Sequence, residues 1–438
     1  MANATETAAD AAPTLAQAAR VWARIGLLSF GGPAAQIALM HREIVEGRKW
    51  LSERQFLDGL SFCMLLPGPE AMQLATYAGW RMHGTLGGLV AGLLFVIPGA
   101  VVIMALAAIY SSFGHVPLVE ALFFGIKAAV LVIVVEALVR VAKKALSHRL
   151  HWAIAGAAFV GIFFLSLPYP LIILIAALLG WRLASRQAGQ DSMDANGDMN
   201  ADTDAISLRG SLATIAIWLA IWLLPLAALG WLAVPEILLE LGKFFSTLAV
   251  VTFGGAYAVL AYMAQDVVVR FGWLSAVEMV DALGLAETTP GPLILVTQFV
   301  GFLAGAREGG PVLGLAAALV TLWVTFAPCF LWIFAGAPYI EWIGRQPRLK
   351  AALSAITAAV VGVILNLSIW FALHVLFSDV TRRQWGPVTL WHPEPASVDG
   401  LALALFLLCG VLAFGGRWGI FRILVTASLL GAGLRLLW

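Results

Sequence analysis

Long apolar runs separated by short polar segments make up most of the chain. Runs such as residues 86–110, 118–141 and 208–231 are each long enough to cross a hydrocarbon core of about 30 Å as an α-helix. They lack the alternation of polar and apolar residues that is typical of outer-membrane barrel strands. Because a spanning segment must satisfy its own backbone groups, the pattern predicts an all-α polytopic membrane protein.

Shorter apolar segments precede these runs and are interrupted by glycine and proline. One begins near residue 15, is broken at Gly31-Gly32-Pro33 and ends near residue 45. The next reaches Leu66, is broken at Pro67-Gly68-Pro69 and ends near residue 80. None of the four pieces is long enough to cross a bilayer alone. Full-length helices are expected to follow near residues 85–111, 116–142, 150–166 and 169–184.

The same order of parts returns in the second half of the chain. The sequences FGG at 30–32, WLS at 50–52 and PGP at 67–69 recur at 253–255, 273–275 and 290–292, at one constant offset. Over residues 29–70 the two copies share 15 identities in 42 positions without a gap, and farther on the offset increases slightly. An internal duplication follows, with a first repeat at 1–184, an acidic flexible linker at 185–209, a connecting transmembrane helix at 210–232 and a second repeat at 233–438.

Two topologies fit the broken segments: each pair crosses the membrane as one interrupted helix, or each folds back as a re-entrant hairpin. The loops at 111–117 and 167–170 carry no Lys or Arg, whereas residues 139–149 carry four. Cytoplasmic loops are enriched in these residues, and the hairpin arrangement keeps the basic loop at residues 42–54 inside. It is therefore favoured. Together with the extra helix it gives the two halves inverted topology, which is frequent among secondary transporters.

Composition narrows the functional class. The chain is 61% hydrophobic and 12% charged, with mean hydropathy +0.92 and a net charge of +1, so the expected partner is the lipid bilayer and no nucleic acid is implied. The three cysteines are scattered along apolar segments, and no metal-ligand spacing, nucleophile motif or ATP-binding loop is present. We therefore expect neither an enzyme nor a cofactor or metal, and the N-terminus predicts no cleaved signal.

Two motif blocks carry a family resemblance. The first repeat contains SFGGP and, from Leu65, LLPGPEAMQLATYAGWRMHGTLGGLVAGLLFVIPG; the second contains TFGGAYAVLAYM and, from Asp281, DALGLAETTPGPLILVTQFVGF. In order and spacing these blocks resemble the chromate ion transporter family in its long, two-domain form. The resemblance covers the chain except for its termini and the acidic linker. It implies efflux of chromate across the inner membrane of a bacterium and resistance to chromate.

The helix breaks supply a physical rationale for binding a tetrahedral dianion. A helix that restarts inside the membrane presents free N–H groups and the positive end of its dipole. Glycine lets an oxyanion approach the backbone, and proline fits the first helical turn. The alternative is that the breaks are packing kinks, because Gly and Pro are frequent in membrane helices. The candidate substrate-binding residues at the breaks are Gly31, Gly32, Pro33, Pro67, Gly68, Pro69, Gly254, Gly255, Pro290, Gly291 and Pro292.

Polar side chains near the breaks extend this site. Lys127 lies midway along its predicted helix and is the candidate fixed positive charge on the anion path, since intramembrane charges usually face such paths. The alternative is a structural ion pair with Glu120 or with a neighbouring helix. Arg24 precedes the first break and is a further candidate, unless it faces a lipid headgroup or a carboxylate. The neutral candidates are Gln73, Thr76, Tyr77, Thr288, Thr289 and Gln298, with a hydrogen bond between packed helices as the alternative for each.

Two carboxylates are candidates for proton coupling. Glu70 directly follows the first PGP, and Glu287 precedes the second. Glu70 either complements the dipole of the helix that it begins or occupies the anion site until it is protonated or displaced. Export itself is favourable, because a dianion leaving a negative-inside cell gains about 4.6 kcal/mol per 100 mV.

Some choices stay open at the level of sequence. A transporter of another tetrahedral oxyanion, notably sulfate, is the alternative function, since backbone amides discriminate poorly between ions of equal shape and charge. The driving force, by potential alone or with proton antiport, is not decided. A homodimer is compatible with the apolar surface, but no motif indicates the oligomeric state.

Overall fold

The computed structural model describes residues 13–114, 116–187, 208–232, 234–253, 255–340, 343, 346–416 and 418–437. Gly254 and residues 188–207, most of the expected linker, lie outside this part of the chain. The elements are α1 (Leu15–Leu28), α2 (Gly32–Met40), η1 (His41–Gly47), α3 (Glu53–Cys63), α4 (Glu70–Phe113), α5 (Pro117–Ala145), α6 (Arg149–Phe163), α7 (Tyr169–Gln187), α8 (Leu208–Trp231), α9 (Glu236–Val251), α10 (Ala256–Gln265), η2 (Asp266–Arg270), α11 (Ala276–Thr288), η3 (Leu293–Leu295), α12 (Val296–Gly336), η4 (Ala337–Tyr339), α14 (Pro347–Leu376), β1 (Val380–Trp385), β2 (Val388–Pro393), η5 (Pro395–Ser397), α15 (Gly400–Gly410), η6 (Val411–Gly415) and α16 (Ile420–Leu437).

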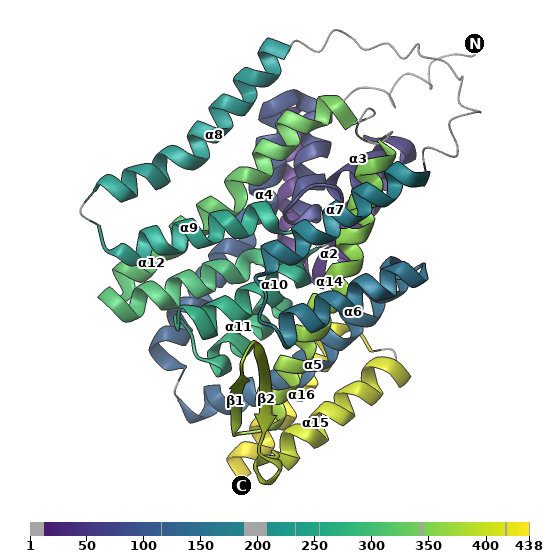
Figure 1. Ribbon diagram of the computed structural model, residues 1–438. Coiled ribbons are helices and arrows are strands. Elements are labelled where there is room, and N and C mark those ends of the chain that lie inside the picture. Colours follow the sequence, from purple (N-terminus) through teal and green to yellow (C-terminus); the bar gives the residue numbers. More distant parts are fainter. Residues whose placement is uncertain are drawn as a thin grey trace, which may run out of the picture.

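Helices dominate the structure, as Figure 1 shows. Within the described residues, five helical segments are long and apolar enough to cross a membrane, and they correspond to α4, α5, α8, α12 with its flanking turns, and α14. This confirms the predicted all-α, multi-pass membrane protein. Of the four full-length helices expected after the first two breaks, α6 and α7 are shorter apolar helices rather than candidate spans.

The local signals that begin helices recur in both halves. Ser52 caps α3 and exchanges hydrogen bonds with Gln55 three residues later, and Ser275 caps α11 in the same way with Glu278. Such a capping box satisfies two N–H groups that the first turn leaves free. The two boxes are related by the same offset as the FGG and PGP motifs, so the duplication extends to the details of the backbone.

Each half also contains one long helix with a sharp kink. In α4 the helical backbone is interrupted at His83 and Gly84, and in α12 at Gly309 and Gly310. The second residue of each kink is a glycine with a positive φ, 61° at Gly84 and 77° at Gly310, which glycine adopts without steric cost. The short helix after PGP and the first full-length helix are therefore two arms of one kinked element, where the sequence pattern had indicated separate helices.

The two halves interlock. In Figure 1, α5 of the first half lies with α15 and α16 of the second, and α14 of the second half packs against α6 and α7 of the first. Glycines permit the close approach: a Cβ on Gly125 would lie 1.8 Å from the Ala427 carbonyl oxygen, and one on Gly362 would lie 2.1 Å from that of Ala155. Because the buried core is shared in this way, each half supports the other.

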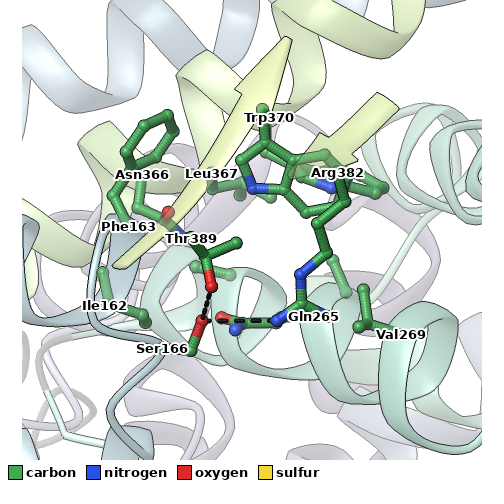
Figure 2. A pocket seen from close by; sticks show the side chains of 13 residues that line it. Ile162, Phe163, Ser166, Gln265, Val269, Asn366, Leu367, Trp370, Arg382 and Thr389 are labelled. Carbon is green, nitrogen blue, oxygen red and sulfur yellow. Dashed lines mark hydrogen bonds between the residues drawn. The ribbon is translucent and has the colours of Figure 1, made fainter. Parts of the chain in front are cut away.

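A β-hairpin follows α14, which the sequence analysis did not predict. Strands β1 and β2 pair antiparallel, with Trp385 opposite Val388, so the loop holds only Gly386 and Pro387. Gly386 has φ 58°, as tight hairpin loops require. Figure 2 shows how the hairpin is attached: Thr389 of β2 meets Ser166 of the α6–α7 loop at 3.2 Å, beside Arg382 and Gln265.

Candidate functional site

The four helix breaks meet at the centre of the molecule, and each half contacts the other there. The Gly68 N–H in the first PGP donates to the Thr252 carbonyl oxygen at 2.9 Å, and the Gly291 N–H in the second PGP donates to the Ser29 carbonyl oxygen at 2.8 Å. The two donors are equivalent positions of the duplication, and so are the two acceptors. The same backbone hydrogen bond is therefore made twice, once in each direction between the repeats.

The residue types at the breaks explain this geometry. Gly68 and Gly291 have φ of 115° and 91°, and Gly31 has φ of 85°, all conformations that favour glycine. The hydroxyl of Ser29 donates to the Ile25 carbonyl oxygen, and that of Thr252 to the Leu248 carbonyl oxygen. These hydroxyls cover carbonyls that the ending helices α1 and α9 leave free.

Each PGP loop also packs against the long helix of the other half. A Cβ on Gly99 of α4 would lie 2.3 Å from the Pro290 carbonyl oxygen, and one on Gly68 would lie 3.0 Å from the Cys329 sulfur of α12. Gly99 and Cys329 each follow a proline inside their helix. Both loops are therefore held on two sides by the opposite repeat.

A small central cavity lies where these segments meet. Its volume is about 10 Å³, near the minimum that holds one water molecule. The starts of α2, α4, α10 and the η3–α12 segment all contribute to its wall. Its lining residues are Pro33, Gln36, Pro69, Glu70, Ala71, Ala256, Pro292 and Leu293. Among the residues predicted from the sequence, the structure thus brings together Pro33, Pro69, Pro292 and Glu70.

Gln36 is a residue of this cavity that the sequence analysis missed. Its side-chain Nε2 donates to the carbonyl oxygens of Gly291, at 2.7 Å, and Ser29, at 3.3 Å. The side chain is buried, and its Oε1 has no hydrogen-bond partner within the described structure. It is the one polar side chain between Pro33 and Met40, and this isolation in an apolar segment was the signal that could have identified it.

The two candidate carboxylates occupy different surroundings. Glu70 lines the central cavity, and within the described residues it forms no hydrogen bond or ion pair; its Oε2 lies 3.6 Å from where a Cβ on Gly255 would stand. Glu287 is buried at the end of α11, where its Oε1 accepts a hydrogen bond from the Tyr257 hydroxyl at 2.9 Å. The other oxygen of Glu287 has no hydrogen-bond partner among the residues that the structure describes.

The glutamine and threonine candidates bond to backbone rather than line the central cavity. The Gln73 Nε2 donates to the Pro67 carbonyl oxygen at 2.7 Å, and the Gln298 Nε2 to that of Ala100 at 3.1 Å. The hydroxyls of Thr288 and Thr289 donate to carbonyls of their own helix. These glutamine and threonine side chains therefore stabilise the backbone around the cavity.

The structure separates both candidate cations from the central cavity. Arg24 has a side chain that is 61% exposed and lies 4.0 Å from Glu43, so it does not line the cavity that it was expected to reach. The Lys127 Nζ lies 3.2 Å from Asp281 Oδ1 on α11 of the other half, rather than beside Glu120. Asp281 is buried and also accepts a hydrogen bond from the Tyr110 hydroxyl at 2.7 Å.

Two larger cavities lie on α3 and α11, the helices that lead to the PGP loops. The first, the Arg81 cavity, has a volume of about 620 Å³ and is lined by Arg54, Gln55, Asp58, Ser61, Phe62, Leu65, Tyr77, Arg81, Ile340 and Lys350. The second, the Arg307 cavity, has a volume of about 570 Å³, and its lining includes Tyr110, Gly114, Glu120, Lys127, Glu278, Asp281, Arg307, Asp399 and Arg435. Asp58 corresponds to Asp281 in the duplication, and Gln55 corresponds to Glu278. The two cavities are therefore built from equivalent positions of the two repeats.

Comparison with known proteins decides the family. The sequence profile of the family described as chromate transporter matches residues 16–181 and 239–434, which is most of the chain. The chain belongs to the chromate transporter family. The resemblance inferred from the GGP and PGP motif blocks is confirmed. Both matched segments of this transporter family contain the breaks that meet at the central cavity.

Several known transporters are similar to the chain over most of its length. A chromate transport protein of Cupriavidus metallidurans is 30% identical over 80% of this chain and 81% of its own. A chromate transport protein of Pseudomonas aeruginosa is 32% identical over 83% of each, and an uncharacterised transporter of Methanocaldococcus jannaschii is 23% identical over 81% of this chain and 84% of its own. No solved structure matches the chain. These relatives are named transporters and not enzymes, as expected for this chain.

Proposed function

We propose that the protein is a secondary transporter that exports chromate from the cytoplasm across the bacterial inner membrane and so confers resistance. The relatives named chromate transport proteins support the substrate. The observation that carries the mechanism is the convergence of four helix starts on one central cavity. Helix N-termini attract anions through free N–H groups and the helix dipole, so the electrostatic surroundings of the cavity favour an anion.

The proposed architecture is a pair of inverted repeats, at residues 1–184 and 233–438, joined by the linker and the connecting helix. The direction of the long helices supports it. From the centre, the first arm of α4 leads to the Arg81 cavity, and its second arm ends at Gly114 in the Arg307 cavity. α12 takes the opposite course: its first arm leads to Arg307, and its end adjoins Ile340 in the Arg81 cavity.

Re-entrant hairpins are the proposed form of the broken segments. In the first half, α3 leads into the PGP loop and the first arm of α4 leads back from it. The two arms are in contact, because a Cβ on Gly59 of α3 would lie 2.3 Å from a ring atom of Tyr77 on α4. In the second half, Arg307 of α12 bonds to Glu278 near the start of α11. Each PGP thus forms the tip of a helical hairpin whose two arms touch, and the tips of the two hairpins meet at the centre.

The proposed binding step uses the backbone more than side chains. The N–H groups at the starts of α2, α4, α10 and the η3–α12 segment would replace part of the hydration shell of chromate, and Gly31, Gly32 and Gly255 would let it approach. The cavity of about 10 Å³ is too small for a tetrahedral oxyanion, so binding requires the PGP loops to move apart. We further propose that Glu70 vacates the site on protonation.

Transport by inside-out vesicles tests this function. We expect saturable, potential-driven chromate uptake, and lower chromate accumulation in sensitive cells that express the protein. Glu70→Gln and Glu287→Gln should weaken the response to an imposed pH gradient, while Glu240→Gln, on an exposed position of α9, leaves it unchanged. An identical response in all three variants would exclude a role for these carboxylates, and unsaturable uptake in the unaltered protein would exclude a transporter.

Sulfate is the second candidate substrate, because its shape and charge match those of chromate. The same vesicles separate the two. If chromate is the physiological substrate, excess sulfate should compete weakly and sulfate uptake should be slow. Equal transport of both ions would identify the protein as a general exporter of oxyanions.

A further inference from the structure

The two large cavities occupy equivalent positions but differ in charge. Arg81 and Arg307 each lie three residues before the glycine at the kink of their helix, Gly84 and Gly310. Three further wall positions have diverged between the repeats: Arg54 corresponds to Val277, Gln55 corresponds to Glu278, and, in the later register of the duplication, Lys350 corresponds to Glu120. Each change makes the Arg307 cavity less positive than the Arg81 cavity.

Pairing within each cavity increases this difference. In the Arg81 cavity, Arg54 lies 3.7 Å from Asp58, but Arg81 and Lys350 form no ion pair with any residue that the structure describes. They come from different helices, α4 and α14, and both are exposed. Within the described residues, the cavity therefore contains two cations without a carboxylate partner.

Among the described residues, every lysine and arginine that lines the Arg307 cavity has a carboxylate partner in that cavity. Lys127 lies 3.2 Å from Asp281, and Arg435 lies 3.6 Å from Asp399. Arg307 pairs with Glu278 and also donates to the Trp273 carbonyl oxygen. Glu120 is then left over as a carboxylate that forms no ion pair within the described part of the chain. A dianion that enters the Arg307 cavity therefore meets described cations that are already paired with carboxylates, together with the unpaired carboxylate of Glu120.

From these contacts we infer that the Arg81 cavity is a capture site for the tetrahedral oxyanion and that the Arg307 cavity is its low-affinity release site. A concave wall with an excess of one charge concentrates ions of the opposite charge and raises their rate of binding. The inference rests on the proposed export function, and it adds that the direction of transport is aided by charge differences between duplicated positions. The kink of α4, next to Arg81, and the start of α14, which carries Lys350, lie on the side with most Lys and Arg, which is the expected cytoplasmic side.

Loss of charge in the capture site gives the first test. In inside-out vesicles at low salt, Arg81→Gln/Lys350→Gln should raise the KM for chromate about three- to tenfold with little change in Vmax. At about 1 M salt the difference from the unaltered protein should nearly vanish, because the Debye length falls to about 3 Å. The matched control is Lys143→Gln, which removes an exposed cation at the end of α5 that does not line the cavity. Its KM should stay unchanged; an equal rise in the control would assign the effect to the membrane surface potential and overturn the inference.

Transfer of charge to the release site gives the second test. Val277→Arg/Glu120→Lys places in the Arg307 cavity the residue types of the other repeat. Chromate added inside the vesicles should then inhibit uptake at a concentration several-fold lower than in the unaltered protein. Unchanged inhibition together with an unchanged KM in the first test would refute the inference, whereas absence of saturable chromate uptake in the unaltered protein would instead refute the proposed function.

Discussion

The ammonium group of Lys127 lies 3.2 Å from the buried carboxylate of Asp281 and joins α5 of the first half to α11 of the second. Removal of Lys127 alone would leave Asp281 unpaired, with only the Tyr110 hydroxyl as partner. We predict that Lys127→Met lowers the free energy of unfolding by about 3 kcal/mol or more and that Lys127→Met/Asp281→Asn recovers most of it. Thermal unfolding of the purified protein measures both.

Transport by the same double variant separates two roles of Lys127. If Lys127 contributes to the anion path, the stable double variant should still transport chromate poorly. Normal transport would assign Lys127 to structure alone, and equal stability of Lys127→Met and Lys143→Met would contradict the buried ion pair.

Gly99 tests the packing of the second PGP loop. A methyl group at this position would collide with the Pro290 carbonyl oxygen, 2.3 Å away. Gly99→Ala should therefore displace the loop, cost about 1–3 kcal/mol of stability and reduce transport. The control is Gly156→Ala, at a helical glycine with open space around its Cβ position, which should be neutral or slightly stabilising. Similar losses in both variants would mean that helix glycines matter in general, rather than this contact.

Inverted topology predicts opposite accessibility for equivalent residues. Arg54→Cys and Val277→Cys place single reporter thiols at equivalent positions of the two repeats, one in each large cavity. A membrane-impermeant thiol reagent should label the first in inside-out vesicles and the second in right-side-out vesicles. The native cysteines are buried, and labelling of the unaltered protein gives the background signal. Labelling of both thiols from the same side would exclude inverted repeats.

Gln36 tests the central cavity. Gln36→Leu removes the donor to the Gly291 carbonyl oxygen and should cost about 1–3 kcal/mol, as expected for a buried acceptor left unpaired. Gln73→Leu removes a similar bond to Pro67 from a side chain that does not line the cavity, so its cost should be comparable. We predict that only Gln36→Leu also raises the KM for chromate in vesicle uptake; a matching rise in both would assign Gln36 to loop support.

The sequence was informative where local chemistry dominates. Glycine at positive φ and proline in a first helical turn are strict local requirements, so the breaks at Gly31 and Gly68 could be located from residue type alone. The repeat then indicated that their counterparts behave alike, and Gly291 does form the same hydrogen bond as Gly68. Family and membrane class follow from patterns that extend over the whole chain.

Contacts between the halves were less accessible to sequence reasoning. An ion pair of Lys127 with a neighbouring helix was one of the alternatives that the sequence left open, but only tertiary packing identifies Asp281 as the partner. The β-hairpin was not predicted, because the only local signal for its turn is Gly386. The charge difference between the two large cavities also became visible only when the structure placed Lys350 and Glu120 in equivalent walls.

The central cavity, with room for about one water molecule, has a consequence for the cell that carries the protein. An open path lined by helix N-termini would let phosphate and other metabolic anions escape down the membrane potential. In the proposed function, the two hydrogen bonds between the halves, from Gly68 to Thr252 and from Gly291 to Ser29, would close such a path with uncharged backbone groups. Under the proposed function, the protein at rest would be closed to ions, and the membrane would keep its gradients until binding of the oxyanion moves the two loops apart.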